Sequence, residues 1–183
     1  TVISYAHIDE VVAFWDPTPD KAEVRGTDFA SCAVVIRDQA GYCYAVDAYI
    51  ARELQTSAQI AAIVDMLWRW QVPILGLEAN TFQSLLTSDI RAAIAQRAQE
   101  AGIPWTVELW PVKNMRNKVL RIKTLEPLVN NGWVQFARTL PPEALKQMAE
   151  FLPIPDAGND DYPDSLEGAI RVTKRLLDQR SAV

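Results

Sequence analysis

Short apolar runs alternate with longer amphipathic segments along most of this chain. The run VVAFW at residues 11–15 is followed by FASCAVVIRD and YCYAVDAYIARE, which the turn QAG joins as an antiparallel hairpin. A helical pattern follows at residues 56–71, where one face carries Ile60, Ile63, Val64, Leu67 and Trp68. Strands that alternate with helices are typical of α/β domains, so we expect a central mixed sheet flanked by helices on both faces.

The second half of the chain continues the alternation. VPILGLEAN indicates a central strand, residues 82–101 a helix that Gly102 ends, and WTVELWPV another strand. The segment KVLRIKTLEPLV predicts a helix that Pro127 bends or shortens. A short strand at WVQFA and helices at about 141–152 and 164–180 complete the pattern. Because no repeat or low-complexity linker interrupts it, we expect residues 1–183 to form a single domain.

The composition excludes several classes of protein. No apolar run approaches the roughly 20 residues of a membrane span, so we expect a soluble, intracellular protein without a membrane partner. The chain has one histidine and two cysteines, and Cys32 and Cys43 lack metal-ligand spacing. Histidine-based catalysis and a zinc site are therefore disfavoured.

Two predicted strands end in carboxylates, at Asp16 and at Glu78. Ligands of open α/β sheets collect at the carboxyl ends of parallel strands. If these two strands are parallel neighbours, about 4.8 Å apart, their carboxylates repel unless a cation lies between them. The alternatives are that Asp16, which precedes Pro17, opens a turn and that Glu78 pairs with a basic residue.

A third acidic group, the stretch NDDYPDSL, contains Asp160, Asp161 and Asp164 near the start of the last predicted helix. One interpretation is a helix cap, with Asp161 as the N-cap and Asp164 at the third helical position. The other is that Asp161 or Asp164 joins Asp16 and Glu78 as a metal ligand. Such an oxygen-only site suits Mg²⁺ or Mn²⁺, and two ions would hydrolyse a phosphodiester.

A basic stretch balances the acids. From Pro111 to Leu125 there is no acidic residue, although the net charge of the chain is −5. We expect this stretch to contact the phosphates of DNA without reading its sequence, through Lys113, Arg116, Lys118 and Arg121. The alternative is an ordinary solvated face. With so few basic residues, the domain alone is expected to bind DNA weakly.

Four segments together resemble the C-terminal nuclease domain of the large terminase subunit of tailed bacteriophages. They are FWDPTPDKAEVRGTDFASCAVVI, GLEANTFQSLL, NKVLRIKTLEPLVNNGWVQF and DDYPDSLEGA, and they occur in the family's order over most of residues 11–170. The resemblance implies an RNase H-like fold and a metal-dependent endonuclease that cuts concatemeric viral double-stranded DNA during genome packaging.

The resemblance also implies roles for individual residues. Asp16 corresponds to the acid of the first strand, Glu78 to the acid of the central strand, and Asp161 or Asp164 to the helix acid. Asp28 matches a further recurrent acid of the family, and its alternative role is to start a solvent-facing strand. The catalytic set implied is Asp16, Glu78 and Asp164, with Asp161 as an additional metal ligand.

The chain departs from a whole terminase subunit because it has no GxxxxGK[ST] phosphate loop. We therefore expect the nuclease domain without the ATPase motor domain. The expected partners are double-stranded DNA, that ATPase domain, the small terminase subunit and the portal protein, in the cytoplasm of an infected bacterium. Two alternatives remain: another RNase H-like nuclease, such as a junction resolvase or a hybrid nuclease, and a non-catalytic docking module of the packaging motor.

Overall fold

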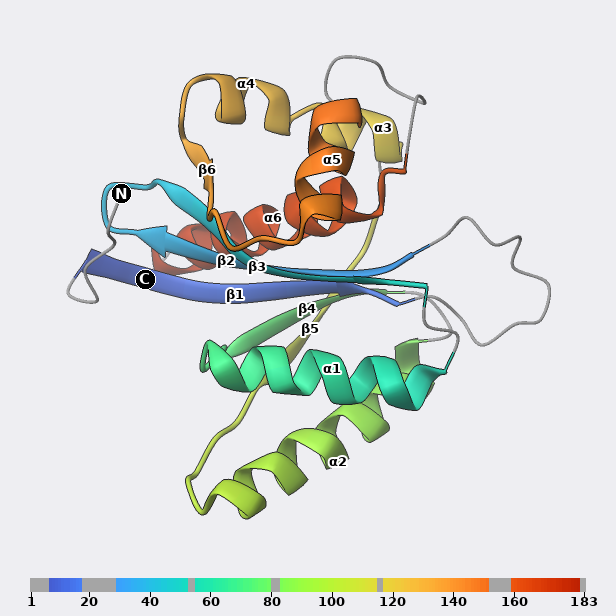
Figure 1. The fold of residues 1–183 in the computed structure, drawn as a ribbon. Coiled ribbons are helices and arrows are strands. Elements are labelled where there is room, and N and C mark those ends of the chain that lie inside the picture. Colours follow the sequence, from blue (N-terminus) through green and yellow to red (C-terminus); the bar gives the residue numbers. More distant parts are fainter. Residues whose placement is uncertain are drawn as a thin grey trace.

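A central mixed β-sheet organises the protein (Figure 1). The computed structural model describes residues 7–17, 29–52, 55–79, 83–114, 117–151 and 159–181. The six strands lie in the order β5-β4-β1-β2-β3-β6. Their bounds are β1 Ile8–Asp16, β2 Ala30–Asp38, β3 Cys43–Ala51, β4 Ile74–Glu78, β5 Glu108–Val112 and β6 Val134–Phe136. The six strands that the sequence predicted along the chain are all present.

The sheet contains both kinds of strand pairing. β1, β2 and β3 form an antiparallel meander, and the predicted hairpin closes at Gly41, whose φ of 93° favours glycine. The pairs β1–β4, β4–β5 and β3–β6 are parallel. Asp16 and Glu78 were expected to lie side by side if their strands were parallel neighbours, and β1 and β4 are paired in this way.

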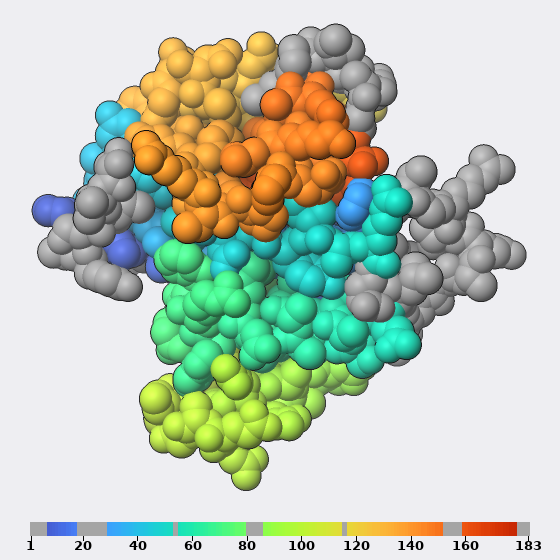
Figure 2. All heavy atoms as spheres, viewed as in Figure 1, coloured from blue at the N-terminus to red at the C-terminus, as the bar shows by residue number. Residues whose placement is uncertain are grey.

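Helices cover both faces of the sheet. The helices α1 (Thr56–Arg69) and α2 (Gln83–Ala101) lie on one face. The opposite face carries α3 (Lys118–Ile122), α4 (Leu125–Asn130), α5 (Pro142–Phe151) and α6 (Asp161–Ser181). In the space-filling view the green helices pack below the sheet and the orange α4–α5 segment packs above it (Figure 2). None of the helices in the described ranges is long and apolar enough to cross a lipid bilayer.

Alternation along β1 divides its side chains between two cores. Trp15 packs into the α1–α2 side with residues such as Leu67, and Phe14 packs into the α6 side with residues such as Leu166. Each of these side chains is at most 2% exposed. The apolar composition of β1 therefore follows from burial on both faces.

α6 approaches the sheet closely because two glycines face Phe14. A Cβ atom on Gly168 of α6 would lie 2.5 Å from the Phe14 ring, and one on Gly76 of β4 would lie 2.8 Å from it. The hydroxyl of Ser165 donates a hydrogen bond of 3.0 Å to the backbone carbonyl of Ser31. These contacts hold the first half of α6 against β1 and β2.

Two expected helix boundaries were wrong. The single helix expected at residues 118–129 is two helices, and the break falls at residues 123–124 instead of at Pro127. Pro127 is the third residue of α4, where its missing N–H has no intrahelical partner to lose. Likewise, α6 begins at Asp161 instead of residue 164, and Pro163 is tolerated in its first turn for the same reason.

Candidate active site

Three elements bring acidic residues to one edge of the sheet. Asp16 is the last residue of β1, and Glu78 is the last residue of β4. The two strands are parallel neighbours in which Trp15 pairs with Leu77, so both end at the same edge. Asp161 and Asp164 lie in the first turn of α6.

Backbone and side-chain contacts place the first turn of α6 beside the end of β1. Ser31, which accepts the hydrogen bond from Ser165, is also the cross-strand partner of Asp16. From the other side, the backbone N–H of Tyr162 donates to the side chain of Gln147 on α5, at 2.9 Å. Ser31, Gln147, Tyr162 and Ser165 are completely buried. The position of the α6 acids is therefore fixed by the core.

The acids act on one another electrostatically. Burial, followed by the charges of Asp164, Glu78 and Asp161, raises the pKa of Asp16 to about 7, against the opposing charge of Lys118. Burial and the charge of Glu78 also raise the pKa of Asp164, against the opposing effect of Lys118 and Arg121. Four carboxyl groups from β1, β4 and α6 therefore share one electrostatic environment.

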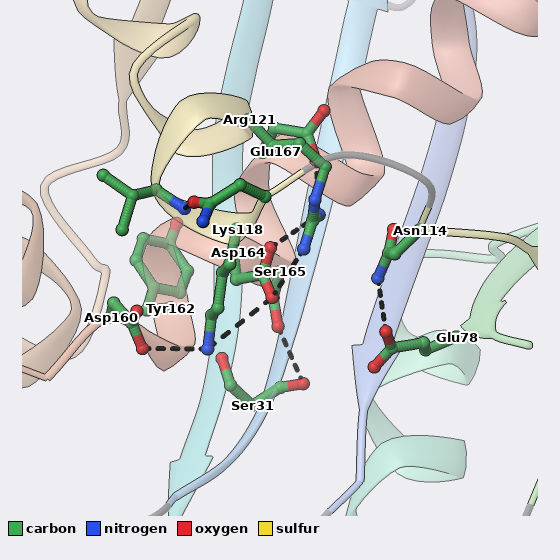
Figure 3. A network of polar contacts seen from close by, with 12 residues as sticks. Ser31, Glu78, Asn114, Lys118, Arg121, Asp160, Tyr162, Asp164, Ser165 and Glu167 are labelled. Atoms are coloured by element: carbon green, nitrogen blue, oxygen red, sulfur yellow. Dashed lines mark hydrogen bonds and ion pairs between the residues drawn. The ribbon is translucent and has the colours of Figure 1, made fainter. Parts of the chain in front are cut away.

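Two cations of α3 neutralise part of this charge. The Arg121 guanidinium lies 2.8 Å from Oδ1 of Asp164 and 3.0 Å from Oε2 of Glu167. The Lys118 ammonium lies 2.8 Å from Oδ1 of Asp160 and 3.7 Å from Oδ2 of Asp164 (Figure 3). Burial lowers the pKa of Lys118, but the hydrogen bond that it donates to Asp160 and the charge of Asp164 raise it above its ordinary value.

A chain of polar contacts connects Glu78 to Asp164. The side-chain amide of Asn114 donates a hydrogen bond to Glu78 (Figure 3), and Arg171 donates to the amide oxygen of Asn114 at 2.8 Å. Arg171 also lies 3.4 Å from Glu167, which contacts Arg121 and, through it, Asp164. Two acids on different elements are thus oriented by one network.

The donor set suits a hard divalent cation, because it consists of carboxylate oxygens without histidine or cysteine. Across the residues that the structure describes, however, no group of three acidic, histidine or cysteine side chains is arranged to hold a metal ion. Asp164 instead faces Arg121 and Lys118, and Glu78 accepts the hydrogen bond from Asn114. The carboxylate donors fit a metal ion chemically. To bind one, Asp164 and Glu78 would have to give up these present contacts.

The predicted site residues have different positions. The structure brings Asp16, Glu78, Asp161 and Asp164 to one edge of the sheet, whereas Asp28 and Arg116 lie outside the described residues. Lys113 is exposed after β5, while Lys118 and Arg121 face the acids. Contact of these basic residues with DNA stays a prediction. In the alternative interpretation Asp161 was the N-cap of this helix; it is instead the first helical residue.

Asn114, Glu167 and Arg171 were not expected at the site. Glu167 lies one helical turn after Asp164, and Arg171 is four residues further along, which is the spacing of an ion pair on one helix face. That spacing could have placed both side chains with Asp164. For Asn114, which reaches Glu78 from the end of a neighbouring strand, the sequence carries no comparable signal.

Solved structures share this architecture, although no family model and no curated protein matches the chain. The human cytomegalovirus terminase nuclease domain matches with a TM-score of 0.65 and 15% identity, over 94% of this chain and 86% of that one. A manganese-soaked structure of that domain matches with a TM-score of 0.63 and 13% identity, over 93% and 86%. The yeast mitochondrial Holliday junction resolvase matches with a TM-score of 0.52 and 12% identity, over 93% and 83%.

Because the sequence identities of these matches are low, the matches show a similarity of fold alone. The matches extend over nearly the whole chain, and so include the six-stranded sheet and the helices on both of its faces. The chain therefore has an α/β fold of the RNase H-like kind, with a central mixed sheet flanked by helices, as its resemblance to the terminase nuclease domain implied.

Proposed function

We propose that this protein is a metal-dependent endonuclease that cleaves concatemeric viral double-stranded DNA during genome packaging. The observation that carries the proposal is the convergence of Asp16, Glu78, Asp161 and Asp164 on one sheet edge. Grouping these acids costs stability in the metal-free protein, since burial and mutual repulsion raise the pKa of Asp16. The similarity of fold to a terminase nuclease domain supports the proposal.

In this proposal Asp16, Glu78 and Asp164 are the catalytic acids, and Asp161 is an additional ligand in the same helical turn. Two bound Mg²⁺ or Mn²⁺ ions would supply an activated water and neutralise the charge that develops on the leaving oxygen. Asp16 would hold its ligand position as the ionised carboxylate, a form that a bound cation favours. Asn114 and Arg171 orient Glu78, and Arg121 orients Asp164.

The substrate would be held through its backbone. Packaged DNA has no fixed sequence at most positions, so contacts to phosphates suffice. Lys113 is exposed beyond the end of β5, the strand next to β4, and is therefore available for such a contact. We propose the ATPase domain of the same subunit, the small terminase subunit and the portal protein as further partners, in the cytoplasm of an infected bacterium.

Plasmid nicking tests the proposal. The purified chain should nick and then linearise supercoiled plasmid in Mn²⁺ or Mg²⁺, and a chelator should abolish the reaction. Asp16→Asn or Glu78→Gln should reduce the rate by at least about a hundredfold, because each removes a charged ligand. Asp178→Asn is the matched control, since Asp178 is an exposed acid on α6. Full activity of both site variants would refute the assignment.

A junction-resolving nuclease is the second candidate, and the match to the yeast resolvase favours it. Rates on linear duplex, a four-way junction and an RNA–DNA hybrid of equal length distinguish the candidates. A packaging nuclease should cut the duplex at least as fast as the junction, whereas a strong preference for the junction or the hybrid would support the alternative. Absence of cleavage on all three would favour a non-catalytic docking module.

A further inference from the structure

Lys118 places a positive charge within the acidic group at the sheet edge. Its ammonium lies 2.8 Å from Asp160 and 3.7 Å from Asp164, and its charge also favours the ionised form of Asp16. Figure 3 shows the side chain extending from α3 to the carboxylates at the start of α6. An extended basic side chain on a DNA-contacting face would instead point to solvent.

Lys118 differs from its neighbour Arg121 in how firmly it is held. The Arg121 side chain is 7% exposed and lies between Asp164 and Glu167, so that it cannot leave without uncovering two buried carboxylates. The Lys118 side chain is 37% exposed, and one of its partners, Asp160, is itself 32% exposed. A flexible four-carbon stem can carry this ammonium from the acids to water with little disturbance of the fold.

We propose that the Lys118 ammonium is an internal counter-ion that holds the acidic group together without metal and is displaced when a divalent cation binds. This inference rests on the proposed function, because it assumes that Asp164 is a metal ligand. It accounts for the absence, across the described part of the chain, of a three-residue group arranged to hold a metal. Arg121 contacts both oxygens of Asp164, and the Lys118 ammonium lies 3.7 Å from one of them, Oδ2.

Displacement also gives Lys118 a second position. Once the ammonium leaves the carboxylates, it lies at the protein surface beside the site, where a DNA phosphate can replace Asp160 as its partner. The predicted DNA contact of Lys118 would therefore follow metal binding instead of preceding it.

Manganese binding to the metal-free chain tests the inference. Isothermal titration with MnCl₂ at pH 8 and low salt should show that Lys118→Met binds Mn²⁺ at least about tenfold more tightly than the wild type, because the Lys118 ammonium no longer competes for the acids. The matched control is Lys123→Met, which removes the same charge from an exposed position just after α3. It should bind within about twofold of the wild type. Lys118→Gln is the second variant, in case the methionine variant does not fold.

Thermal unfolding gives an independent readout. In chelator, Lys118→Met should melt below the wild type because the acids lose their counter-ion, and saturating Mn²⁺ should raise its melting temperature more than that of the wild type. Unchanged or weaker Mn²⁺ binding by both Lys118 variants would overturn the inference. If the wild type nevertheless binds Mn²⁺ and nicks plasmid, the proposed nuclease stands. If no variant, nor the wild type, binds Mn²⁺, both proposals fail.

Discussion

The guanidinium of Arg121 lies 2.8 Å from the carboxylate of Asp164, and both side chains are almost fully buried, at 7% and 6% exposure. Arg121 also contacts Glu167, so one cation neutralises two acids of α6. A buried ion pair of this kind contributes little net stability when intact, but the loss of one partner leaves an uncompensated charge in the interior. Arg121 therefore couples the fold of α3 and α6 to the charge of the site.

Replacing Arg121 tests this coupling. Arg121→Met should lower the free energy of unfolding by about 3 kcal/mol at pH 8, because the buried Asp164 and Glu167 would lose their shared cation and keep only the longer contacts to Lys118 and Arg171. Urea denaturation of the metal-free chain measures the change. The exposed Lys123→Met serves as the control and should stay within about 0.5 kcal/mol of the wild type.

A double variant separates the ion pair from simple packing. Asp164→Asn removes one of the two stranded charges, so Arg121→Met with Asp164→Asn should lose less stability than the two single changes added together. Strict additivity of the two changes would contradict a direct interaction between the side chains.

The raised pKa of Asp16 predicts how stability depends on pH. In the unfolded chain Asp16 ionises near its ordinary pKa of 3.8, whereas in the folded protein it holds its proton up to about pH 7. The folded state therefore binds more protons between these values, and its stability falls as the pH rises from about 4 to 7. Above pH 7 the contribution of Asp16 levels off.

Asp16→Asn should remove this dependence. In chelator, the variant should gain stability relative to the wild type across that window, reaching on the order of 4 kcal/mol by pH 8. Denaturation curves at pH 4, 5, 6, 7 and 8 measure the difference. Asp178→Asn, an exposed acid of α6, should show no such trend. A constant difference between wild type and Asp16→Asn at every pH would contradict the raised pKa.

Sequence patterns predicted most of the fold because they report on burial. The apolar strands, the hairpin and the amphipathic α1 each have a periodicity that is typical of one kind of secondary structure. The acids at residues 16 and 78 could be placed because the carboxyl ends of parallel strands meet at one edge of a sheet. The partners of these acids could not be predicted in the same way. Lys118 and Arg121 are cations one turn apart on α3, and the sequence does not distinguish a solvent-facing turn from one that faces α6.

The close contact between α6 and the sheet yields the last prediction. A methyl group on Gly168 would meet the Phe14 ring at 2.5 Å, and the ring cannot move away because Gly76 and the rest of the core enclose it. Gly168→Ala should therefore destabilise the protein by about 2 kcal/mol through overpacking, despite the better helix propensity of alanine.

The same substitution should also disturb the site. Asp164 and Glu167 lie on the turn of α6 that precedes Gly168, so a shift of the helix away from Phe14 moves both acids relative to Asp16 and Glu78. Phe14→Leu provides the matched test, because the smaller side chain makes room for the added methyl group. In that background Gly168→Ala should cost less than half of what it costs in the wild type, measured by urea denaturation. Equal losses in both backgrounds would show that the helix does not rest on Phe14.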